Sequence, residues 1–333
     1  YLMIREGSSE KNLDDLLPLV TDRTYKRCFF VVDDRTCADL LAEGDVDAVV
    51  RKAILKGLDP IRAIQMATIN PAEYFRLHRV GAIAPGCVAN FMVMEDLFKF
   101  NVNMVFHRGN LVAREGELLA PLSRKTAPAL TRSVNAKQFG VEDLRLPFAG
   151  EKQPVIETVP GQIITKRIYV KPKIEGDAVV ADIDRDLLKL AVVERHRATG
   201  NIGKGLVKGF GLRRGALASS ISHDSHNIII VGTNDRDIHA AFREIERMQG
   251  GLAAVADGKV LESLALPIGG LLSDEALETV VDKLEKLERT ASELGCALPS
   301  PFATLSFLAL PVIPELRLTD KGMVDVSAFK LIQ

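Results

Sequence analysis

The sequence predicts a chain of mixed α/β and α+β class with at least two domains. Its 333 residues correspond to roughly two or three domains of about 150 residues each. Helix-like and strand-like stretches alternate over residues 1–80. Over 81–120 apolar residues recur with a period of two, which is typical of strands, and over 132–333 strands alternate with helices. A polar, proline-containing linker is expected at 121–131.

The first segment is expected to contain a short buried strand followed by helices. Residues 28–32 form a continuous apolar run, which is typical of a strand buried on both faces of a parallel sheet. Apolar spacing predicts a helix over 46–54 that ends near Gly57, because glycine suits the position after a helix. A second helix is expected to begin at Pro60 and to break at Asn70-Pro71.

The later segments predict a β-module and then a mixed domain. Residues 90–94 predict a strand, and residues 105–113 predict a hairpin that turns at Arg108-Gly109-Asn110. Further strands are expected over 162–170, 228–231 and 252–255, and helices over 185–196, 236–248 and 274–295.

Composition excludes several classes of protein. Lys and Arg number 43 against 44 Asp and Glu, so there is no basic excess for nucleic-acid binding. No apolar stretch approaches the roughly 18 residues that suggest a membrane span, and residues 1–6 do not resemble a signal peptide. The four cysteines are too sparse for a disulfide framework. We therefore expect a cytoplasmic protein that binds neither nucleic acid nor a membrane.

Asp33 is the first candidate functional residue, because it follows the buried strand and precedes a helix-like segment. Catalytic groups gather at this end of the strands in (β/α) barrels, and a carboxylate there can bind a metal and take a proton from metal-bound water. The local pattern alone favours a simpler alternative, in which Asp33 or Asp34 caps the following helix.

Two polar segments are further candidates. The segment His223-Asp224-Ser225-His226-Asn227 holds two of the six histidines, and it could bind a metal or polar ligand or equally form a polar turn. Arg5-Glu6-Gly7-Ser8 is a polar loop with the option of an ion pair. Residues 203–211 are rich in glycine but match neither phosphate-binding pattern, which favours glycine turns between short strands.

Several motifs resemble those of a known family. REGS at 5–8, DD at 33–34, ATINPA at 67–72 and GAIAPG at 81–86 resemble the late part of an amidohydrolase. ERH at 194–196, GFG at 209–211, HDSHN at 223–227, LPIGGL at 266–271 and LSFLALPVIPEL at 305–316 resemble the extra C-terminal domain of bacterial adenine deaminases. The resemblance runs nearly end to end, and its C-terminal motifs are the more specific ones.

The resemblance implies metal-dependent hydrolysis of adenine, a small-molecule substrate, to hypoxanthine and ammonia in purine salvage or catabolism. Residues 1–80 would be the end of an N-terminally truncated (β/α)8 barrel, 81–120 a β-sandwich module, 121–131 a linker and 132–333 the family's C-terminal domain. It also implies a homo-oligomer with Mn²⁺ or Fe²⁺ at the barrel mouth, binuclear in the complete protein.

The resemblance also implies roles for individual residues. Asp33 matches the carboxylate at the end of the eighth barrel strand, which would ligate the metal and carry the proton from bound water to the leaving amine. His223, Asp224, His226 and Asn227, together with Arg5 and Glu6, are expected to contact the substrate or close the site.

Some features leave other functions open. Val32 and Asp45 stand where the family usually has Thr and His, which puts catalytic efficiency or the exact substrate in question. Asn90 stands in the β-module where Asp is usual, which should matter only structurally. The alternatives are another amidohydrolase acting on a cyclic C–N substrate, or a catalytically dead interaction protein. All six histidines follow Asp33 and the chain opens without Met, so we expect a fragment that is inactive alone.

Overall fold

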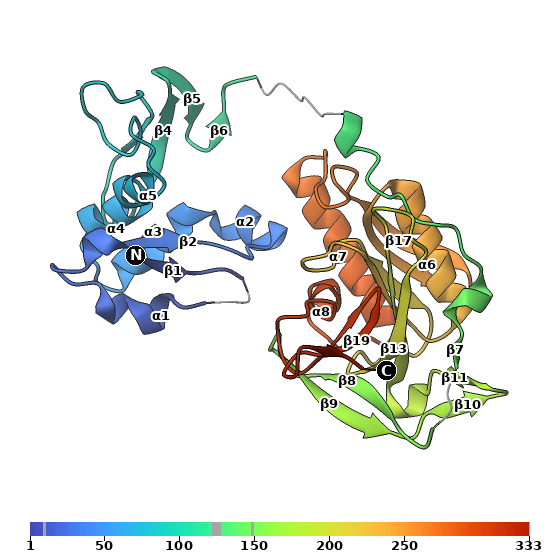
Figure 1. Ribbon diagram of the computed structural model, residues 1–333. Coiled ribbons are helices and arrows are strands. Elements are labelled where there is room, and N and C mark those ends of the chain that lie inside the picture. The colour runs from blue at the N-terminus through green and yellow to red at the C-terminus, as the bar shows by residue number, and fades with distance from the viewer. Residues whose placement is uncertain (9–10, 122–127, 148–149, 333) are drawn as a thin grey trace. The chain divides into compact units, whose positions relative to one another are not determined.

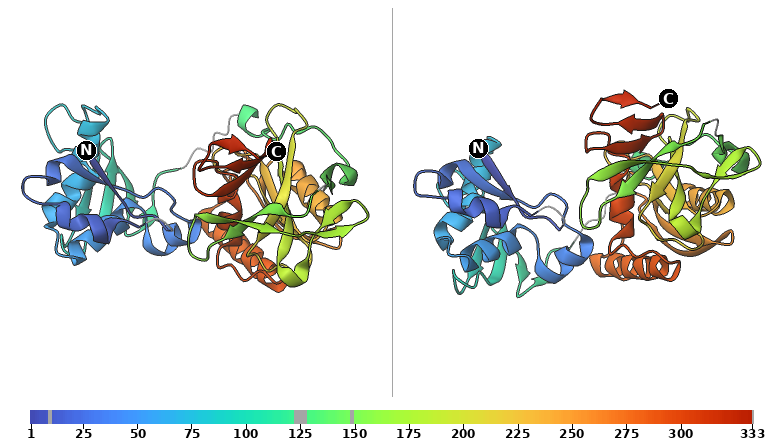
Figure 2. Two further views of the ribbon diagram at one scale, coloured as in Figure 1. Left: turned by 60° about the horizontal axis from the view of Figure 1, so that its bottom comes forward. Right: turned by 90° about the horizontal axis from the view of Figure 1, so that it is seen from below.

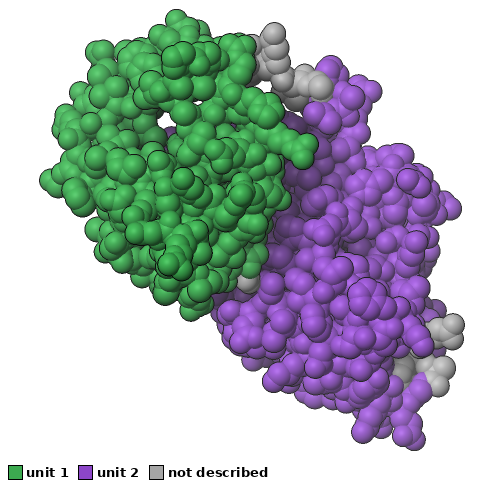
Figure 3. All heavy atoms as spheres, turned by 60° about the vertical axis from the view of Figure 1, so that its left-hand side comes forward, with its two compact units in different colours: residues 1–124 green, residues 125–333 purple. Residues whose placement is uncertain are grey.

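The computed structural model describes residues 1–8, 11–121, 128–147 and 150–332 (Figure 1). The chain divides into two compact units, residues 1–124 and 125–333, which Figure 3 colours separately. Each contains helices and sheets, which confirms the mixed class predicted from the sequence, whereas the expected barrel remains a prediction. Most of the predicted linker, residues 122–127, lies outside the described residues.

Unit 1, residues 1–124, begins with two parallel strands. β1 (Leu2–Arg5) and β2 (Cys28–Val31) pair with Arg5 opposite Val31. Parallel strands require a crossover, which here consists of α1 (Leu13–Leu16) and the 3-10 turns η1 (Leu17–Leu19) and η2 (Tyr25–Arg27). The helices after β2 are α2 (Cys37–Glu43), α3 (Val46–Leu55), α4 (Pro60–Ala67) and α5 (Ile69–Tyr74).

Local signals explain most of these elements. The first three residues of β2 are buried, which confirms the predicted strand. Gly57, with φ +95°, follows the end of α3, and the Asp59 carboxylate accepts a hydrogen bond from the Arg62 main chain at the start of α4. These two helix boundaries were therefore predictable from residues at the helix ends.

The predicted helix break at Asn70-Pro71 is wrong, because the break occurs at Thr68, which has φ −130° and ψ −84°. Asn70 and Pro71 lie instead in the first turn of α5. The buried Asn70 amide donates 2.8 Å hydrogen bonds to the carbonyls of Tyr25 and Cys28. Asn70 therefore holds the start of β2 in place, a contact across more than 40 residues that the local pattern does not indicate.

The predicted strand and hairpin within 81–120 are confirmed. β3 (Phe91–Met94), β4 (Val102–His107), β5 (Asn110–Arg114) and β6 (Glu117–Leu118) form one antiparallel sheet in that order. Arg108 and Gly109 both have positive φ at the hairpin turn, as a type I′ turn requires. The sheet packs against the core of unit 1 through Met92, Met94 and Val102. The β-sandwich expected over these residues is represented here by a single sheet.

Unit 2, residues 125–333, is built on an eight-stranded sheet in the order β17-β16-β14-β15-β12-β13-β8-β9 (Figure 1, Figure 2). Its strands are β8 (Gln153–Thr158), β9 (Thr165–Val170), β12 (Leu187–Val193), β13 (Ile202–Lys208), β14 (Ala216–Ser219), β15 (Ile228–Gly232), β16 (Gly251–Ala256) and β17 (Lys259–Ala265). All neighbours are antiparallel except β13 and β8.

Smaller elements surround this sheet. Its helices are α6 (Asp235–Met248), α7 (Leu277–Glu293) and α8 (Pro301–Phe307). Two small sheets consist of β7 (Leu146–Pro147), β10 (Lys173–Glu175) and β11 (Ala178–Val180), and of β18 (Leu316–Thr319), β19 (Gly322–Asp325) and β20 (Lys330–Leu331). The 3-10 turns are η3 (Pro128–Leu130), η4 (Val141–Leu144) and η5 (Ile183–Arg185). None of the described helices is long and apolar enough to cross a membrane.

The predicted helix over 185–196 is wrong, because this segment contains β12, a central strand whose seven residues are all buried. A continuous apolar run between two strands has no period of its own, so its pattern does not distinguish a buried strand from a buried helix. The other strands, predicted at 162–170, 228–231 and 252–255, are confirmed as β9, β15 and β16. The two later helices are confirmed as α6 and α7, and α7 begins at Leu277, three residues after the predicted start at 274.

The glycines of residues 203–211 permit close packing. Gly203 and Gly205 lie on β13, opposite Val192 and Leu190, on the face away from α6. A Cβ at Gly203 would lie 1.8 Å from the carbonyl oxygen of Thr319, and one at Gly205 would lie 2.4 Å from the Met323 methyl. Gly203 and Gly205 therefore let β18 and β19 approach β13, a structural role that differs from a phosphate-binding loop. Gly209 and Gly211 follow the end of β13 with φ +111° and +76°, in agreement with the predicted glycine turns.

Candidate functional site

Asp33 lies at the carboxyl edge of the parallel pair β1–β2. Arg5 ends β1, and Asp33 follows β2 with φ +57°. The two side chains form a 2.9 Å ion pair, Arg5 Nη1 to Asp33 Oδ2, and the Asp33 side chain is 54% exposed. The N-cap of α2 is Thr36, whose hydroxyl accepts a hydrogen bond from the Asp39 main chain. Asp33 is therefore a solvent-accessible carboxylate and does not cap the helix.

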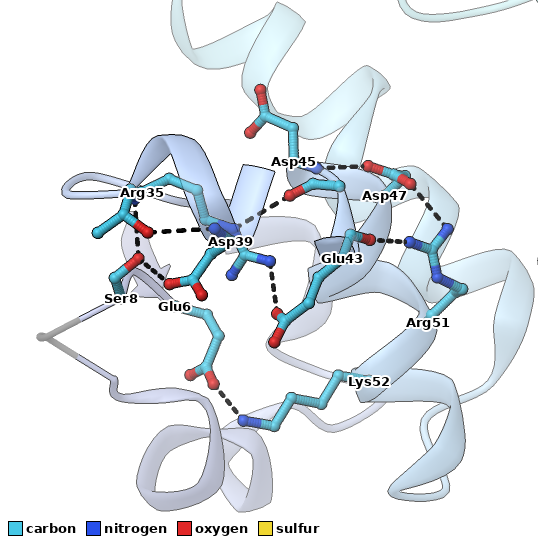
Figure 4. A network of polar contacts seen from close by, with 11 residues as sticks. Glu6, Ser8, Arg35, Asp39, Glu43, Asp45, Asp47, Arg51 and Lys52 are labelled. Atoms are coloured by element: carbon cyan, nitrogen blue, oxygen red, sulfur yellow. Dashed lines mark hydrogen bonds and ion pairs between the residues drawn. The ribbon is translucent and has the colours of Figure 1, made fainter. Parts of the chain in front are cut away.

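Glu6 is buried next to this edge, and both of its carboxylate oxygens are engaged, one of them with Lys52 as Figure 4 shows. Oε2 accepts a 3.1 Å hydrogen bond from the Leu13 main chain at the start of α1, and Oε1 pairs with the ammonium of Lys52 on α3. Glu6 thereby joins β1 to two helices.

A polar network holds the segment that follows Asp33 (Figure 4). The Ser8 hydroxyl donates to the Asp39 carboxylate and accepts from the Thr36 main chain at 2.8 Å. Arg35 donates to the Glu43 carboxylate at 2.6 Å and to the carbonyl of Gly44 at 3.0 Å.

Asp45, one of the departures from the family pattern, lies just after this network at the start of α3. Its main chain donates a 2.7 Å hydrogen bond to the Asp47 carboxylate, which also pairs with Arg51 at 2.7 Å. The conformation of the loop beyond β2 is therefore fixed mainly by charged side chains.

The residues at this edge do not fit a metal ion by themselves. Within the described ranges, no group of three or more His, Cys, Asp or Glu side chains could hold one. Asp33 is ion-paired with Arg5, and divalent iron or manganese prefers several oxygen or nitrogen ligands. Asp33 belongs to unit 1, whereas the histidine segment belongs to unit 2.

The segment 223–227 connects β14 to β15. The His223 main chain donates to the Ser306 carbonyl at 3.0 Å, and its ring stacks on Phe307 with centroids 4.7 Å apart. The rings of His223 and His226 lie 6.2 Å apart between centroids, while Asp224 is exposed. This geometry is a polar turn that presents two neighbouring imidazoles, and the binding of a metal or polar ligand by the segment stays a prediction.

The second half of the segment is more buried. The Asn227 side chain accepts a 3.4 Å hydrogen bond from the Arg195 main chain and donates one of 3.3 Å to Asp320. Burial lowers the pKa of His226, and the nearby His223 and Arg195 lower it further, so the ring is neutral at pH 7.

Two buried polar atoms lack partners among the described residues here, namely Ser222 Oγ just before the segment and His226 Nδ1 within it. Buried polar atoms in proteins are normally satisfied by protein groups, water or a ligand. Ser222 has no exposed surface and was not predicted, because a single serine before a polar turn carries no distinguishing signal. The pair marks one place in unit 2 that can accommodate an added polar group.

Comparison with known proteins follows the division into units. Residues 162–330 match the family described as adenine deaminase C-terminal domain, and residues 3–112 match the amidohydrolase family. The chain is 59% identical over 332 residues to an adenine deaminase of Dehalococcoides mccartyi and 48% identical over 333 residues to adenine deaminase 2 of Carboxydothermus hydrogenoformans. Each match covers 100% of this chain but only 58% of the relative.

Proposed function

This chain belongs to the adenine deaminase C-terminal domain family. From that membership we propose that it takes part in the hydrolysis of adenine by water, which gives hypoxanthine and ammonia. The observation that carries the proposal is the similarity to proteins named adenine deaminase along the whole chain, at up to 59% identity. Because the chain spans 58% of those relatives, we propose the activity for the complete enzyme, meaning the longest gene product that contains this chain.

Family membership implies a divalent metal, and we propose Mn²⁺ or Fe²⁺, bound as a binuclear centre in the complete enzyme. Of the described residues at the carboxyl edge of β1–β2, Asp33 is the proposed ligand. Since these residues do not form a metal site by themselves, the other ligands are expected from residues outside this chain.

Asp33 is also the proposed proton carrier between the attacking water and the leaving amine. Its exposed carboxylate is suited to this role, because proton transfer requires a group that can come within hydrogen-bond distance of the reacting atoms. Arg5 orients the carboxylate through the 2.9 Å ion pair. Glu6 fixes the end of β1 through its bonds to Leu13 and Lys52.

The segment His223, Asp224, His226 and Asn227 is proposed to contact the substrate or to close the site against water. The support for this role is two buried atoms without partners among the described residues, the Ser222 hydroxyl and His226 Nδ1. The lowered pKa of His226 also favours its neutral ring at pH 7. A neutral imidazole offers one donor and one acceptor, which suits recognition of a heterocycle that has both.

Replacing either histidine is expected to reduce catalysis far more than stability. His223→Ala and His226→Ala in the complete enzyme should each lower kcat/KM for adenine by about 10-fold or more, since positioned acid–base or hydrogen-bonding groups contribute at least this much. His107→Ala, which removes an exposed imidazole at the end of β4, is the control and should change little. If the activity of the two histidine variants falls only as far as their melting temperature falls, the proposed role is contradicted.

The activity itself is tested by loading the purified complete enzyme with Mn²⁺ or Fe²⁺ and following adenine loss, hypoxanthine formation and ammonia release. Turnover of another cyclic C–N substrate, but not adenine, would favour a different amidohydrolase. No turnover of either would favour an interaction protein.

Light scattering of the same sample tests the proposed homo-oligomer, and cell fractionation tests the proposed cytoplasmic location.

A further inference from the structure

Arg195 connects three distant parts of unit 2. It follows β12 and is only 1% exposed. Its guanidinium donates Nε to the carbonyl of His226, Nη1 to that of Ser133 at 2.9 Å, and Nη2 to that of Gly269 at 3.1 Å. Within the described residues its side-chain partners are carbonyls, with no carboxylate among them.

The surroundings of Arg195 are shaped to its guanidinium. A Cβ at Gly270 would lie 2.6 Å from Nη1, so the glycine leaves room for the group. Burial lowers the pKa of Arg195, and burying a cation without a counter-charge is costly unless its hydrogen bonds are satisfied. A residue whose only role was to fill the core would not require a charge at this position.

Arg195 donates two hydrogen bonds to the histidine segment. The side chain bonds the carbonyl of His226, and the main chain bonds the side chain of Asn227. The adjacent His196 bonds the carbonyl of Ser225 through Nε2 at 2.8 Å. The segment is thus held along one side by two consecutive residues, and His226 is kept in a left-handed conformation with φ +52°.

We propose that Arg195 is a positioning residue that fixes the main chain of segment 223–227, and through it the rings of His223 and His226, in the arrangement that catalysis requires. This inference rests on the role proposed above for the two histidines. A planar guanidinium that donates to three carbonyls defines their relative positions, which a single-point ammonium cannot do. Displacing a positioned group by about 1 Å can cost about 100-fold in rate.

Arg317 provides a matched control in the same unit. It is also fully buried, and it donates to the carbonyls of Ile163, Ile313 and Pro314 at 2.7 to 3.2 Å. Burial lowers the pKa of Arg317 to about 10. Within the described part of the chain, its side-chain hydrogen bonds go to residues outside 223–227, so its replacement tests the loss of a buried arginine that has no bond to that segment.

The test compares Arg195→Lys with Arg317→Lys in the complete enzyme. Both should lower the melting temperature by similar amounts, but only Arg195→Lys should lower kcat for adenine, by about 10-fold or more. Imidazole ¹H–¹⁵N spectra should show shifted His223 and His226 signals in Arg195→Lys and unchanged ones in Arg317→Lys. If Arg195→Lys does not fold, Gly270→Ala, which crowds the guanidinium while retaining Arg195, replaces it.

The outcomes separate the two proposals. Equal losses of kcat in the two lysine variants, or unshifted histidine signals in Arg195→Lys, would overturn the positioning role of Arg195. If His223→Ala and His226→Ala lower kcat/KM while Arg195→Lys leaves kcat unchanged, the inference alone fails. If both alanine variants retain full activity, the proposed function of the segment fails, and the inference fails with it.

Discussion

The 333-residue chain alone is expected to release no measurable ammonia from adenine, whether it is loaded with Mn²⁺ or with Fe²⁺. The reason is the number of available ligands. All six histidines follow Asp33 in the chain, at positions 78, 107, 196, 223, 226 and 239, and no described group of three ligand side chains could hold a metal. One carboxylate paired with an arginine makes at most a weak metal site.

The measurement compares ammonia release by the purified chain with release by the complete enzyme under identical metal loading. The adenine deaminase of Dehalococcoides mccartyi serves as the positive control for the assay. Circular dichroism and a cooperative melting curve must first show that the chain is folded, because exposed strand edges and apolar surface promote aggregation. Turnover comparable to that of the complete enzyme would overturn the ligand argument and would require a metal site within this chain.

Asp33→Asn is expected to lower the turnover of the complete enzyme by at least about 100-fold, as the loss of general acid–base catalysis does. The substitution preserves shape, and its amide oxygen can still accept the hydrogen bond from Arg5, so the fold should persist. Steady-state kinetics with adenine provide the measurement, together with the melting temperature and the metal content of the variant.

Asp22→Asn is the matched control for this substitution. Asp22 pairs with Arg62 at 2.5 Å in the same unit and is 81% exposed, and it lies in the crossover between β1 and β2, before β2 begins at Cys28. Exposed ion pairs of this kind contribute little to stability, so turnover should stay within about 2-fold of the original. Near-normal turnover by Asp33→Asn would show that Asp33 is neither a metal ligand nor a proton carrier. Its role would then be limited to the ion pair with Arg5.

Elements governed by short-range signals were predictable from the sequence. The start of α4 depends on Asp59 and Pro60, which act within one turn, and the hairpin depends on Arg108 and Gly109 at its turn. Asp33 was identified as a candidate because the apolar run before it indicates a buried strand. In each case the physical cause lies within a few residues of its effect.

Only the tertiary structure decided the remaining features, because their causes lie far away in the chain. The apolar segment at 187–193 is a strand because β13 and β15 pair with it on both sides. Asn70 lies in the first turn of α5, where its amide reaches the carbonyl of Cys28. Arg195 contacts the histidine segment because folding brings the carbonyl of His226, together with those of Ser133 and Gly269, to its guanidinium. Hydrogen bonds across tens of residues depend on where folding brings the chain together, and no local pattern of residues records that position.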